Sequence, residues 1–210
     1  MDVLKIAAVI VCAYFLGAIP FGYLVGRLKG INIREHGSGN IGFTNVWRVL
    51  GFKIGLVVLF CDGLKGWLAC FVGFQLFGEW GALIGGIVAI LGHSFSCFIG
   101  FKGGKGIATG GGMLLYMSPP TLIVLISLVA IVCVTIRYMS IGSILAAFLA
   151  PFTLYVFGAS PVYVFGIIPA AAYVIYLHIP NIKRLMNGTE NKLSFKKKYP
   201  DASDANPSKK

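Results

Sequence analysis

Long apolar stretches dominate this sequence and limit what it can fold into. A membrane-spanning helix needs about 20 predominantly apolar residues, and stretches near that length occur at residues 3–25, 54–77, 81–99, 121–136, 141–157 and 162–178. Of the 210 residues, 57% are hydrophobic and only 12% are charged, about half the charged share of a typical soluble domain. A soluble domain of this size has too small an interior to bury so much apolar surface. The sequence therefore predicts an all-α polytopic membrane protein.

The first apolar stretch could be a cleaved signal peptide or a span. Lys5 lies near its start, as in a signal peptide, but the apolar run after it continues without a break through residues 22–25. It thus exceeds the length of a cleavable segment, and further apolar stretches follow it. We expect it to be retained as a transmembrane helix.

Lys and Arg residues gather in three clusters: at residues 27–48, at Lys102 and Lys105, and from residue 183 to the end. Cytoplasmic loops of membrane proteins carry an excess of these residues, so we expect all three clusters on the cytoplasmic side. An even number of spans must then separate each cluster from the next.

Between the first two clusters, residues 54–77 and 81–99 supply two spans, joined by an outer turn at Glu79 and Trp80. Between the second cluster and the tail, three spans are clear. A fourth arises if residues 107–117 form a short, glycine-rich half-helix that prolines break from the next span.

This count predicts a bundle of about seven transmembrane helices, some of them short, with the N-terminus outside and the C-terminus cytoplasmic. A five-span alternative keeps the same parity. We expect Arg137 at an outer or interfacial position. Residues 1–186 would form a single transmembrane domain, and residues 187–210 a basic cytoplasmic tail that is partly disordered.

The 28 glycines suit close packing of membrane helices, because small residues let helix backbones approach one another. Pairs with the small-xxx-small spacing are Gly22/Gly26, Gly51/Gly55, Gly81/Gly85 and Gly106/Gly110. The five cysteines lie in apolar stretches without CxxC or Cys/His spacing, so we interpret them as small buried hydrophobes and not as a disulfide framework or metal site.

Three polar segments interrupt the apolar stretches. The first, GSGNIGFTNVWR at residues 37–48, alternates glycine with short polar residues, so that backbone N–H groups can converge on an anion. Arg48 adds a bidentate cationic group. An ordinary turn between spans is the alternative, but a turn alone does not need so many donors around one arginine.

The second segment is GHSFSCFIGFKGGKGIAT at residues 92–109. It is not a Walker A loop, because Ile99 stands where that motif requires its first glycine and Gly106 replaces the hydroxyl residue. If a helix begins at Ile107, the loop lies at its positive N-terminal end, which favours anion binding.

The third segment is HIPNIKRLMNGTE at residues 178–190. His178 could pack at the interface or contact a ligand, and the neighbouring Asn181 and basic residues make both interpretations reasonable. Separately, Asp62 and Lys65 lie three residues apart in an apolar stretch. Charges at membrane depth are costly when unpaired, so we expect an ion pair with a structural role in preference to a catalytic one.

Taken together, the three segments resemble the signature motifs of the bacterial acyl-phosphate:glycerol-3-phosphate acyltransferases, the PlsY family. The resemblance covers nearly the whole chain and includes the DGLKG sequence at residues 62–66. We call the segments the first motif (residues 37–48), second motif (residues 92–109) and third motif (residues 178–190).

The resemblance implies an acyltransferase of the bacterial plasma (inner) membrane with its active site facing the cytoplasm. It would transfer a fatty acyl group from acyl phosphate to the 1-hydroxyl of sn-glycerol 3-phosphate, giving 1-acyl-sn-glycerol 3-phosphate (lysophosphatidate) and phosphate. This is the first acylation of phospholipid synthesis. The partners would be the two substrates and membrane lipid, with no nucleic acid, obligate protein partner, metal or cofactor, because the acyl donor is already activated.

Direct attack of the acceptor hydroxyl is the expected mechanism, because the sequence shows no Ser-His-Asp set or Cys–His pair for a covalent intermediate. Gly103, Gly104 and Gly106 with Lys105 would surround the acyl phosphate. The proton acceptor is open among His93, His178 and a substrate phosphate oxygen. The expected catalytic residues are Ser38, Arg48, Lys105, His178 and Asn181.

Further residues are expected to bind the substrates. Glu190 would support the third motif, and the others would contact the phosphates. The expected set is Gly39, Asn40, Thr44, Asn45, His93, Lys102, Gly103, Gly104, Gly106, Thr109 and Glu190.

Two rival interpretations come from other functional classes. A transporter or channel for an anionic solute would suit helices broken by glycine with cations at a pore. Against it, the polar residues gather at one predicted face and few ionisable residues lie along the spans. A purely structural membrane subunit would leave the three donor-rich motifs unexplained.

Overall fold

The computed structural model describes residues 2–193 and confirms the all-helical prediction, because this part of the chain contains no strand. The predicted tail from residue 194 onward lies outside the described residues. The elements are α1 (Asp2–Ala18), α2 (Phe21–Leu28), η1 (Ile33–Glu35), α3 (Phe43–Leu50), α4 (Phe52–Ser94), η2 (Cys97–Ile99), α5 (Ile107–Met117), α6 (Pro119–Thr135), α7 (Met139–Val156), α8 (Pro161–Tyr176) and α9 (Ile179–Met186).

Helix α4 consists of two arms that fold back on each other. The backbone leaves the helical region at Phe77 (φ −147°) and Gly78 (φ 60°, ψ −147°), a conformation that glycine adopts without a side-chain penalty. A Cβ atom on Gly81 or Gly85 would collide with backbone carbonyls of the first arm. The expected pair of spans is therefore present as a tightly packed hairpin, and its turn begins two residues before Glu79.

Three segments are long and apolar enough to cross a membrane: Asp2–Leu28, Phe52–Ile99 and Met139–Val156. Helices α8 and α9 pass the same test as a pair bent by 49°. Helices α5 and α6 are apolar but shorter, with 11 and 17 residues. Each predicted stretch is helical, while the number of crossings and the sidedness of the termini stay predictions.

Two helix breaks follow from proline chemistry. Pro20 lies between α1 and α2 and has no N–H to donate, so the carbonyls before it are free to bind elsewhere. Ser118 ends α5 and begins α6, where its hydroxyl accepts a hydrogen bond from the Thr121 N–H at 3.4 Å, and prolines occupy the first turn of α6. The predicted break between the half-helix and the next span is therefore confirmed.

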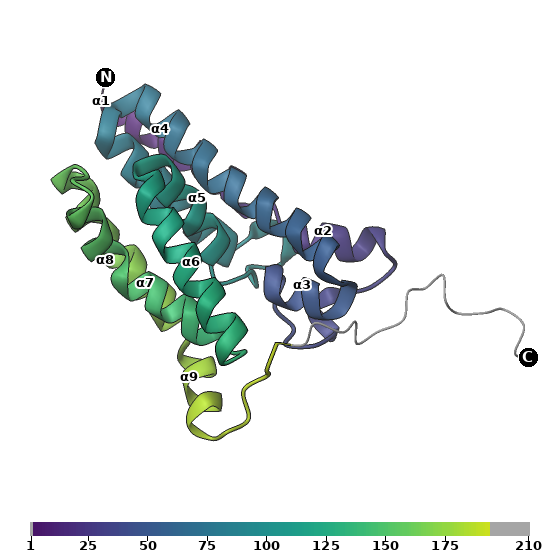
Figure 1. The fold of residues 1–210 in the computed structure, drawn as a ribbon. Helices are drawn as coiled ribbons and strands as arrows, with labels where there is room; N and C mark the ends of the chain where they lie inside the picture. The colour runs from purple at the N-terminus through teal and green to yellow at the C-terminus, as the bar shows by residue number, and fades with distance from the viewer. Residues whose placement is uncertain (1, 194–210) are drawn as a thin grey trace, which may run out of the picture.

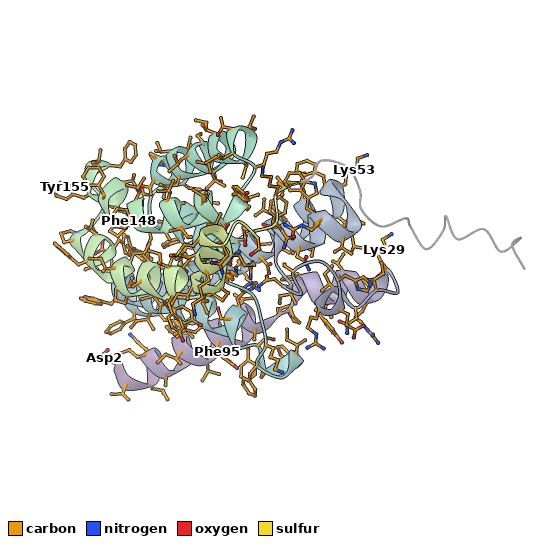
Figure 2. All side chains as sticks on the ribbon, turned by 90° about the horizontal axis from the view of Figure 1, so that it is seen from below. Asp2, Lys29, Lys53, Phe95, Phe148 and Tyr155 are labelled. Atoms are coloured by element: carbon orange, nitrogen blue, oxygen red, sulfur yellow. The ribbon has the colours of Figure 1, made fainter. Side chains whose placement is uncertain are left out.

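The two ends of the bundle carry different elements and residues. In Figure 1, α3 and α9 lie away from the N-terminal end of α1. Figure 2 places Asp2 and Tyr155 at one end, with Lys29 and Lys53 at the other. At the Asp2 end, the Ser160 hydroxyl donates to Glu79 at 2.6 Å and joins the α7–α8 turn to the turn of α4.

Arg137 was expected at an outer or interfacial position, and the fold does not place it at the end of the bundle opposite the motifs. Its carbonyl accepts a hydrogen bond from the Leu193 N–H at 2.7 Å, which places the α6–α7 connection beside the third motif. The reason is the parity of the helices: α5 leads away from the second motif, and α6 returns to the same end.

Some large apolar side chains form the core, and others lie on the outside of the bundle. Met113, Leu154 and Ile167 belong to a buried cluster shared by α4, α5, α7 and α8. By contrast, Phe148 and Phe165 are 68% and 69% exposed. Exposed aromatics along apolar helices fit a molecule whose outer surface faces lipid.

The hairpin packing generates a stability prediction. Gly85→Ala should lower the free energy of unfolding by about 1–3 kcal/mol, because the added methyl group forces the two arms of α4 apart. We expect a lower Tm in detergent for this variant. Gly110→Ala is the matched control, since its Cβ would lie 3.6 Å from Ile90 Cδ1. An equal Tm for the two variants would contradict backbone-to-backbone packing of the hairpin.

Candidate functional site

A cavity of about 1560 Å³ opens at the end of the bundle where α3 and α9 lie, and it joins the three motifs. Its wall includes residues from all three motifs, although they are separated by long stretches of chain. The predicted site residues that line it are Ser38, Gly39, Asn40, Thr44, Asn45, Arg48, His93, Lys102, Gly103, Lys105, Gly106, His178, Asn181 and Glu190.

Asn45 organises the loop of the first motif. Its side-chain oxygen accepts from the Ser38 N–H at 2.8 Å, while the two hydrogens of its amide nitrogen are directed at the carbonyls of Ile33, His36 and Asn40 at 2.9–3.2 Å, one hydrogen being shared between two of them. The side chain is buried, and both of its polar atoms are occupied by backbone groups. Asn45 therefore shapes the loop that presents other donors to the cavity.

The other polar side chains of the first motif form fewer hydrogen bonds with the backbone than Asn45 does. The Asn40 side chain accepts from the Gly42 N–H at 2.8 Å and sets the turn before α3. Within residues 2–193, the side chains of Ser38, Thr44 and Arg48 have no hydrogen-bond partner, although all three line the cavity. Arg48 is half-buried, so its guanidinium is available to a ligand anion.

The Gly-Gly pair of the second motif packs against the end of α4. The Gly103 N–H donates to the Ser94 carbonyl at 2.9 Å, and the Gly104 N–H donates to the His93 carbonyl at 3.1 Å. A Cβ on either glycine would collide with His93. These two N–H groups are therefore not free to surround a phosphate, and the glycines are explained by close packing.

The N-terminus of α5 provides backbone donors instead. Gly106 precedes the helix in the left-handed conformation (φ 76°), which glycine adopts readily, and no side chain caps the helix. Ile107 and Ala108 of the first turn line the cavity. The unpaired N–H groups of a first turn and the helix dipole both favour a bound anion.

A chain of polar contacts connects the second and third motifs. The Lys105 ammonium donates to the Asn181 side-chain oxygen, and the Asn181 amide donates to Glu190 Oε1 at 2.7 Å. Arg184 binds Glu190 Oε2 at 2.7 Å, and the Ser140 hydroxyl donates to Oε1 at 3.0 Å. This contact chain fixes Lys105 beside the cavity.

The protonation properties of the contact chain follow from its surroundings. Burial lowers the pKa of Lys105 to about 8, and the positive charge of Arg184 acts in the same direction while Glu190 opposes it. Burial alone would raise the pKa of Glu190, but hydrogen bonds from Asn181, Arg184 and Ser140 outweigh it and the pKa is lowered. Glu190 is therefore ionised at neutral pH, as its supporting role requires.

His178 lies at the junction of α8 and α9, where its Nδ1 is 2.8 Å from the Val174 carbonyl oxygen. A carbonyl can only accept a hydrogen bond, so Nδ1 carries the proton. In the neutral ring, Nε2 then keeps a lone pair. His178 is buried but lines the cavity, which places an acceptor near the contact chain.

The expected ion pair between Asp62 and Lys65 is confirmed. Lys65 Nζ lies 2.8 Å from Asp62 Oδ1, and both side chains are buried within α4. His93 of the second arm joins them, with its Nδ1 2.8 Å from Lys65 Nζ. The sequence gives no spacing signal for this third member, because the α4 hairpin alone brings His93 to the pair.

Positive charge predominates in the cavity. Among the described residues its wall carries two carboxylates, Asp62 and Glu190, and each has a cationic partner. The cations on the wall are Arg34, Arg48, Lys102, Lys105 and Arg184. This excess suits ligands with phosphate groups.

The cavity continues from its polar end into an apolar slot. Residues of α4, α5 and α6 form the walls, among them Phe60, Trp67, Leu115 and Ile126. Phe60 and Ile126 are more than half exposed on the outer surface of the bundle. The slot can therefore hold a hydrocarbon chain that remains in contact with lipid.

Two predicted site residues do not line the cavity. Gly104 is buried against the His93 ring, and Thr109 is 0% exposed where α5 packs against α4. The Thr109 carbonyl lies so close to Gly66 that a Cβ there would collide with it. Close packing of these two helices accounts for the Thr109 position.

Sequence reasoning missed three residues at the cavity. Arg184 is three residues after Asn181, so helical periodicity could have placed it on the same face of α9. Arg34 donates to the Ile99 carbonyl at 3.2 Å and lies over the Tyr23 ring, and membership of the first basic cluster was its only signal. Ser140 reaches Glu190 from α7 without any local sequence signal.

Comparison with known proteins gives consistent matches over most of the chain. A family model described as glycerol-3-phosphate acyltransferase matches residues 7–188. A glycerol-3-phosphate acyltransferase of Fusobacterium nucleatum is 45% identical over 189 residues, covering 89% of this chain and 97% of the relative. One from Bacillus subtilis (strain 168) is 42% identical over 192 residues, covering 90% and 98%.

Two crystal structures of PlsY (YgiH), an integral membrane glycerol 3-phosphate acyltransferase, are also similar. The glycerol 3-phosphate form has a TM-score of 0.85 at 38% identity, covering 90% of this chain and 96% of the other. The lysophosphatidic acid form has a TM-score of 0.83 at 37% identity with the same coverage.

The first motif generates a prediction about stability. Asn45→Ala should lower the free energy of unfolding by about 2 kcal/mol or more, because it leaves several buried backbone groups without partners. We expect a Tm lower by several degrees in detergent. Thr44→Val is the control on the same helix, since the Thr44 hydroxyl has no partner among the described residues. A Tm for Asn45→Ala equal to that of the control would show that the loop does not depend on this side chain.

Proposed function

The chain belongs to the glycerol-3-phosphate acyltransferase family, and from this premise we propose that it transfers a fatty acyl group from acyl phosphate to the 1-hydroxyl of sn-glycerol 3-phosphate. It is a multi-pass membrane enzyme that acylates glycerol 3-phosphate and forms lysophosphatidate. The proposal adds to family membership that the acyl donor is acyl phosphate. With acyl phosphate as donor, the second product is inorganic phosphate.

The observation that carries the proposal is the joining of unpaired cationic groups and an apolar slot in one cavity. Arg48 and Lys102 have no hydrogen-bond partner within residues 2–193, and Lys105, two residues before α5, lines the same cavity. Both proposed substrates carry phosphate, and one carries a hydrocarbon chain. The polar end suits the two phosphates, and the slot between α4 and α6 suits the chain.

The reaction is a direct displacement at the acyl carbon. The acceptor hydroxyl oxygen forms a bond to the carbonyl carbon, and the bond from that carbon to the phosphate oxygen breaks. Phosphate leaves with the electron pair. The hydroxyl proton passes to the Nε2 of His178 or to an oxygen of the departing phosphate, either of which balances the step.

Lys105 and the first turn of α5 would stabilise the negative charge that develops at the reacting centre. Because the Gly103 and Gly104 N–H groups are bound to carbonyls, this role falls to the Lys105 ammonium and to the backbone after Gly106. Arg48, with Ser38 and Thr44, would hold the phosphate of glycerol 3-phosphate. Asn181 positions Lys105, and Glu190 holds Asn181.

A covalent acyl-enzyme is not part of the proposal. Ser38 lines the cavity, but no histidine lies within hydrogen-bond distance of its hydroxyl in the described part of the chain. The Ser140 hydroxyl donates to Glu190, which is a weak base. A serine nucleophile normally needs an adjacent general base.

The cavity opens at the end of the bundle that carries the basic residues. Lys29 and Lys53 lie at this end (Figure 2), and an excess of Lys and Arg marks cytoplasmic loops. We therefore place the reaction at the cytoplasmic face of the bacterial plasma membrane, where glycerol 3-phosphate arrives from water and the acyl donor from the bilayer.

The deciding experiment supplies purified protein in detergent with glycerol 3-phosphate and one of three donors: acyl phosphate, acyl-CoA or acylated acyl carrier protein. We expect lysophosphatidate and an equal amount of phosphate with acyl phosphate alone. Product from acyl-CoA but not from acyl phosphate would overturn the donor. A liposome flux assay with glycerol 3-phosphate or phosphate tests the transporter alternative, and it should show no flux.

Lys105 generates a prediction about pH. Its pKa is lowered to about 8, so the ammonium loses its proton as the pH rises through that value, and kcat/KM for the acyl donor should fall on the alkaline side. Lys105→Arg should move this fall to higher pH, because arginine stays charged. Lys105→Ala should lose roughly 100- to 1000-fold in kcat while remaining folded.

Lys53→Ala is the matched control for a lost positive charge. Lys53 is an exposed lysine that does not line the cavity, so this variant should keep the activity and pH profile of the parent. If the alkaline fall were the same in Lys105→Arg as in the parent protein, its assignment to Lys105 would be incorrect.

A further inference from the structure

The loop that carries the second motif exposes three phenylalanines. Phe95, Phe98 and Phe101 are 48%, 58% and 60% exposed, and they are spaced three residues apart around η2. We call these three side chains the aromatic wedge. None of them lines the cavity, so substrate binding does not explain them. Exposed apolar side chains grouped in this way mark a surface that contacts another molecule or lipid.

The aromatic wedge continues the outer surface of two apolar helices. The ring centroid of Phe98 lies 6.4 Å from that of Phe15 of α1, and the centroid of Phe95 lies 6.3 Å from that of Tyr173 of α8. Phe15 is itself 52% exposed, on a segment that is long and apolar enough to cross a membrane. The wedge therefore adjoins a surface that faces lipid.

The level of the loop along the bundle agrees with contact to lipid. Figure 2 shows Phe95 at the edge of the molecule, between the end that carries Asp2 and the end that carries Lys29. The Phe95 carbonyl accepts a hydrogen bond from the Tyr14 hydroxyl of α1 at 2.8 Å. The loop is therefore held beside the last turns of an apolar helix and does not extend beyond them into water.

Backbone groups of the loop are bound within the protein. The N–H groups of Ile99 and Phe101 donate to the Ser96 carbonyl at 3.2 and 2.8 Å. Arg34 donates to the Ile99 carbonyl at 3.2 Å, and the Ser96 hydroxyl donates to the Ala18 carbonyl at 2.5 Å. Unpaired backbone groups are costly next to hydrocarbon, so these bonds suit a loop that lies against a bilayer.

Phe101 has a backbone conformation that large side chains rarely adopt. Its φ is 60°, in the left-handed region, and such a conformation persists only where the surrounding structure holds it. The side chain of Phe101 is exposed on the outside of the loop, whereas the next residue, Lys102, lines the cavity. Two adjacent residues therefore face different surroundings, and the position of Lys102 depends on that of the wedge.

We propose that the aromatic wedge inserts into the adjacent bilayer leaflet, at the boundary between headgroups and acyl chains, and thereby fixes the level of Lys102 relative to the membrane surface. Phenylalanine side chains on an otherwise polar element favour this boundary. Naming the leaflet as the cytoplasmic one rests on the proposed function, whereas the contact with lipid does not.

A second copy of the chain is the other possible occupant of this surface. Three half-exposed aromatic side chains offer on the order of 300–450 Å², which is far below the area that a stable interface between two proteins buries. The continuity of the wedge with α1 also favours lipid, because Phe15 and Phe98 form one apolar surface. We therefore assign the surface to phospholipid.

Photo-crosslinking identifies the occupant without reference to activity. The full chain, with Phe98 replaced by p-benzoylphenylalanine, is reconstituted in phosphatidylcholine nanodiscs, irradiated and analysed by mass spectrometry. The same replacement at Phe148, which is 68% exposed on α7, marks lipid contact, and at the exposed Lys29 it marks contact with water.

We expect a yield of lipid adduct at position 98 close to that at position 148 and several-fold above that at position 29. A lipid yield no greater than at position 29 would overturn the proposal. A crosslink to a second copy of the chain in place of lipid would overturn it as well and would assign the surface to an interface between copies.

The native Cys97 reports whether lipid holds the loop in place. It lies between Phe95 and Phe98 and is half-buried. In nanodiscs, Phe98→Ser should raise the rate of Cys97 labelling by a water-soluble maleimide roughly tenfold, because about half of a phenylalanine side chain no longer gains from contact with lipid. Phe98→Leu, which stays apolar, should label like the parent, and Cys97→Ser gives the background. Equal rates for Phe98→Ser and Phe98→Leu would overturn the anchoring role.

Acyl transfer in the same nanodiscs tests the link to Lys102. We expect kcat/KM to fall several-fold in Phe98→Ser and to be restored in Phe98→Leu, while Phe148→Ser, which removes an equally exposed phenylalanine away from the motifs, keeps the parent value. Parent activity in Phe98→Ser despite faster Cys97 labelling would overturn the link. Absence of transfer by the parent protein would refute the proposed function and leave the crosslinking result intact.

Discussion

The contact of Lys105 with Asn181 determines where the cation at the centre of the site can lie. Lys105 precedes α5, and Asn181 belongs to α9, so this one hydrogen bond joins elements that are 76 residues apart. Glu190 then holds Asn181 and Arg184 together. A lysine at the end of an apolar bundle would otherwise extend into water, because its charged end is strongly hydrated. The contact chain keeps it over the cavity, at the cost of a lowered pKa.

Close helix packing provides the frame within which this contact forms. Glycines at positions 81 and 85 let the arms of α4 touch through their backbones, and Gly66 lets α5 approach α4. The same closeness brings His93 to Lys65 and seats the second motif on the end of α4. Rigid support of this kind is what a site that binds two anionic reactants needs, since their repulsion must be overcome by groups already in position.

Hydropathy and motif spacing predicted the helical stretches, the half-helix before Ser118 and the meeting of the three motifs. They could not predict which polar side chains form hydrogen bonds within the protein and are therefore not available to a ligand. The Asn45 side chain, expected to bind substrate, is occupied by backbone groups of the loop, because a buried amide satisfies such groups first. Ser140 and the partnership of His93 with Lys65 depend on contacts between distant helices, for which one sequence has no local signal. An outer position for Arg137 does not follow once the short half-helix is counted as a crossing, because α6 then returns the chain to the end that carries the motifs.

The ion pair of Asp62 and Lys65 was expected to have a structural role in preference to a catalytic one. The structure shows that the pair also contacts His93 of the second motif. A carboxylate and an ammonium inside a helix bundle form a weak source of stability, because desolvation offsets most of their attraction. Their more specific effect is directional. Lys65 Nζ lies 2.8 Å from His93 Nδ1, and Asp62 Oδ1 lies 3.6 Å from the same nitrogen, so a charge pair that contributes little to folding holds the ring in place beneath the glycines of the second motif.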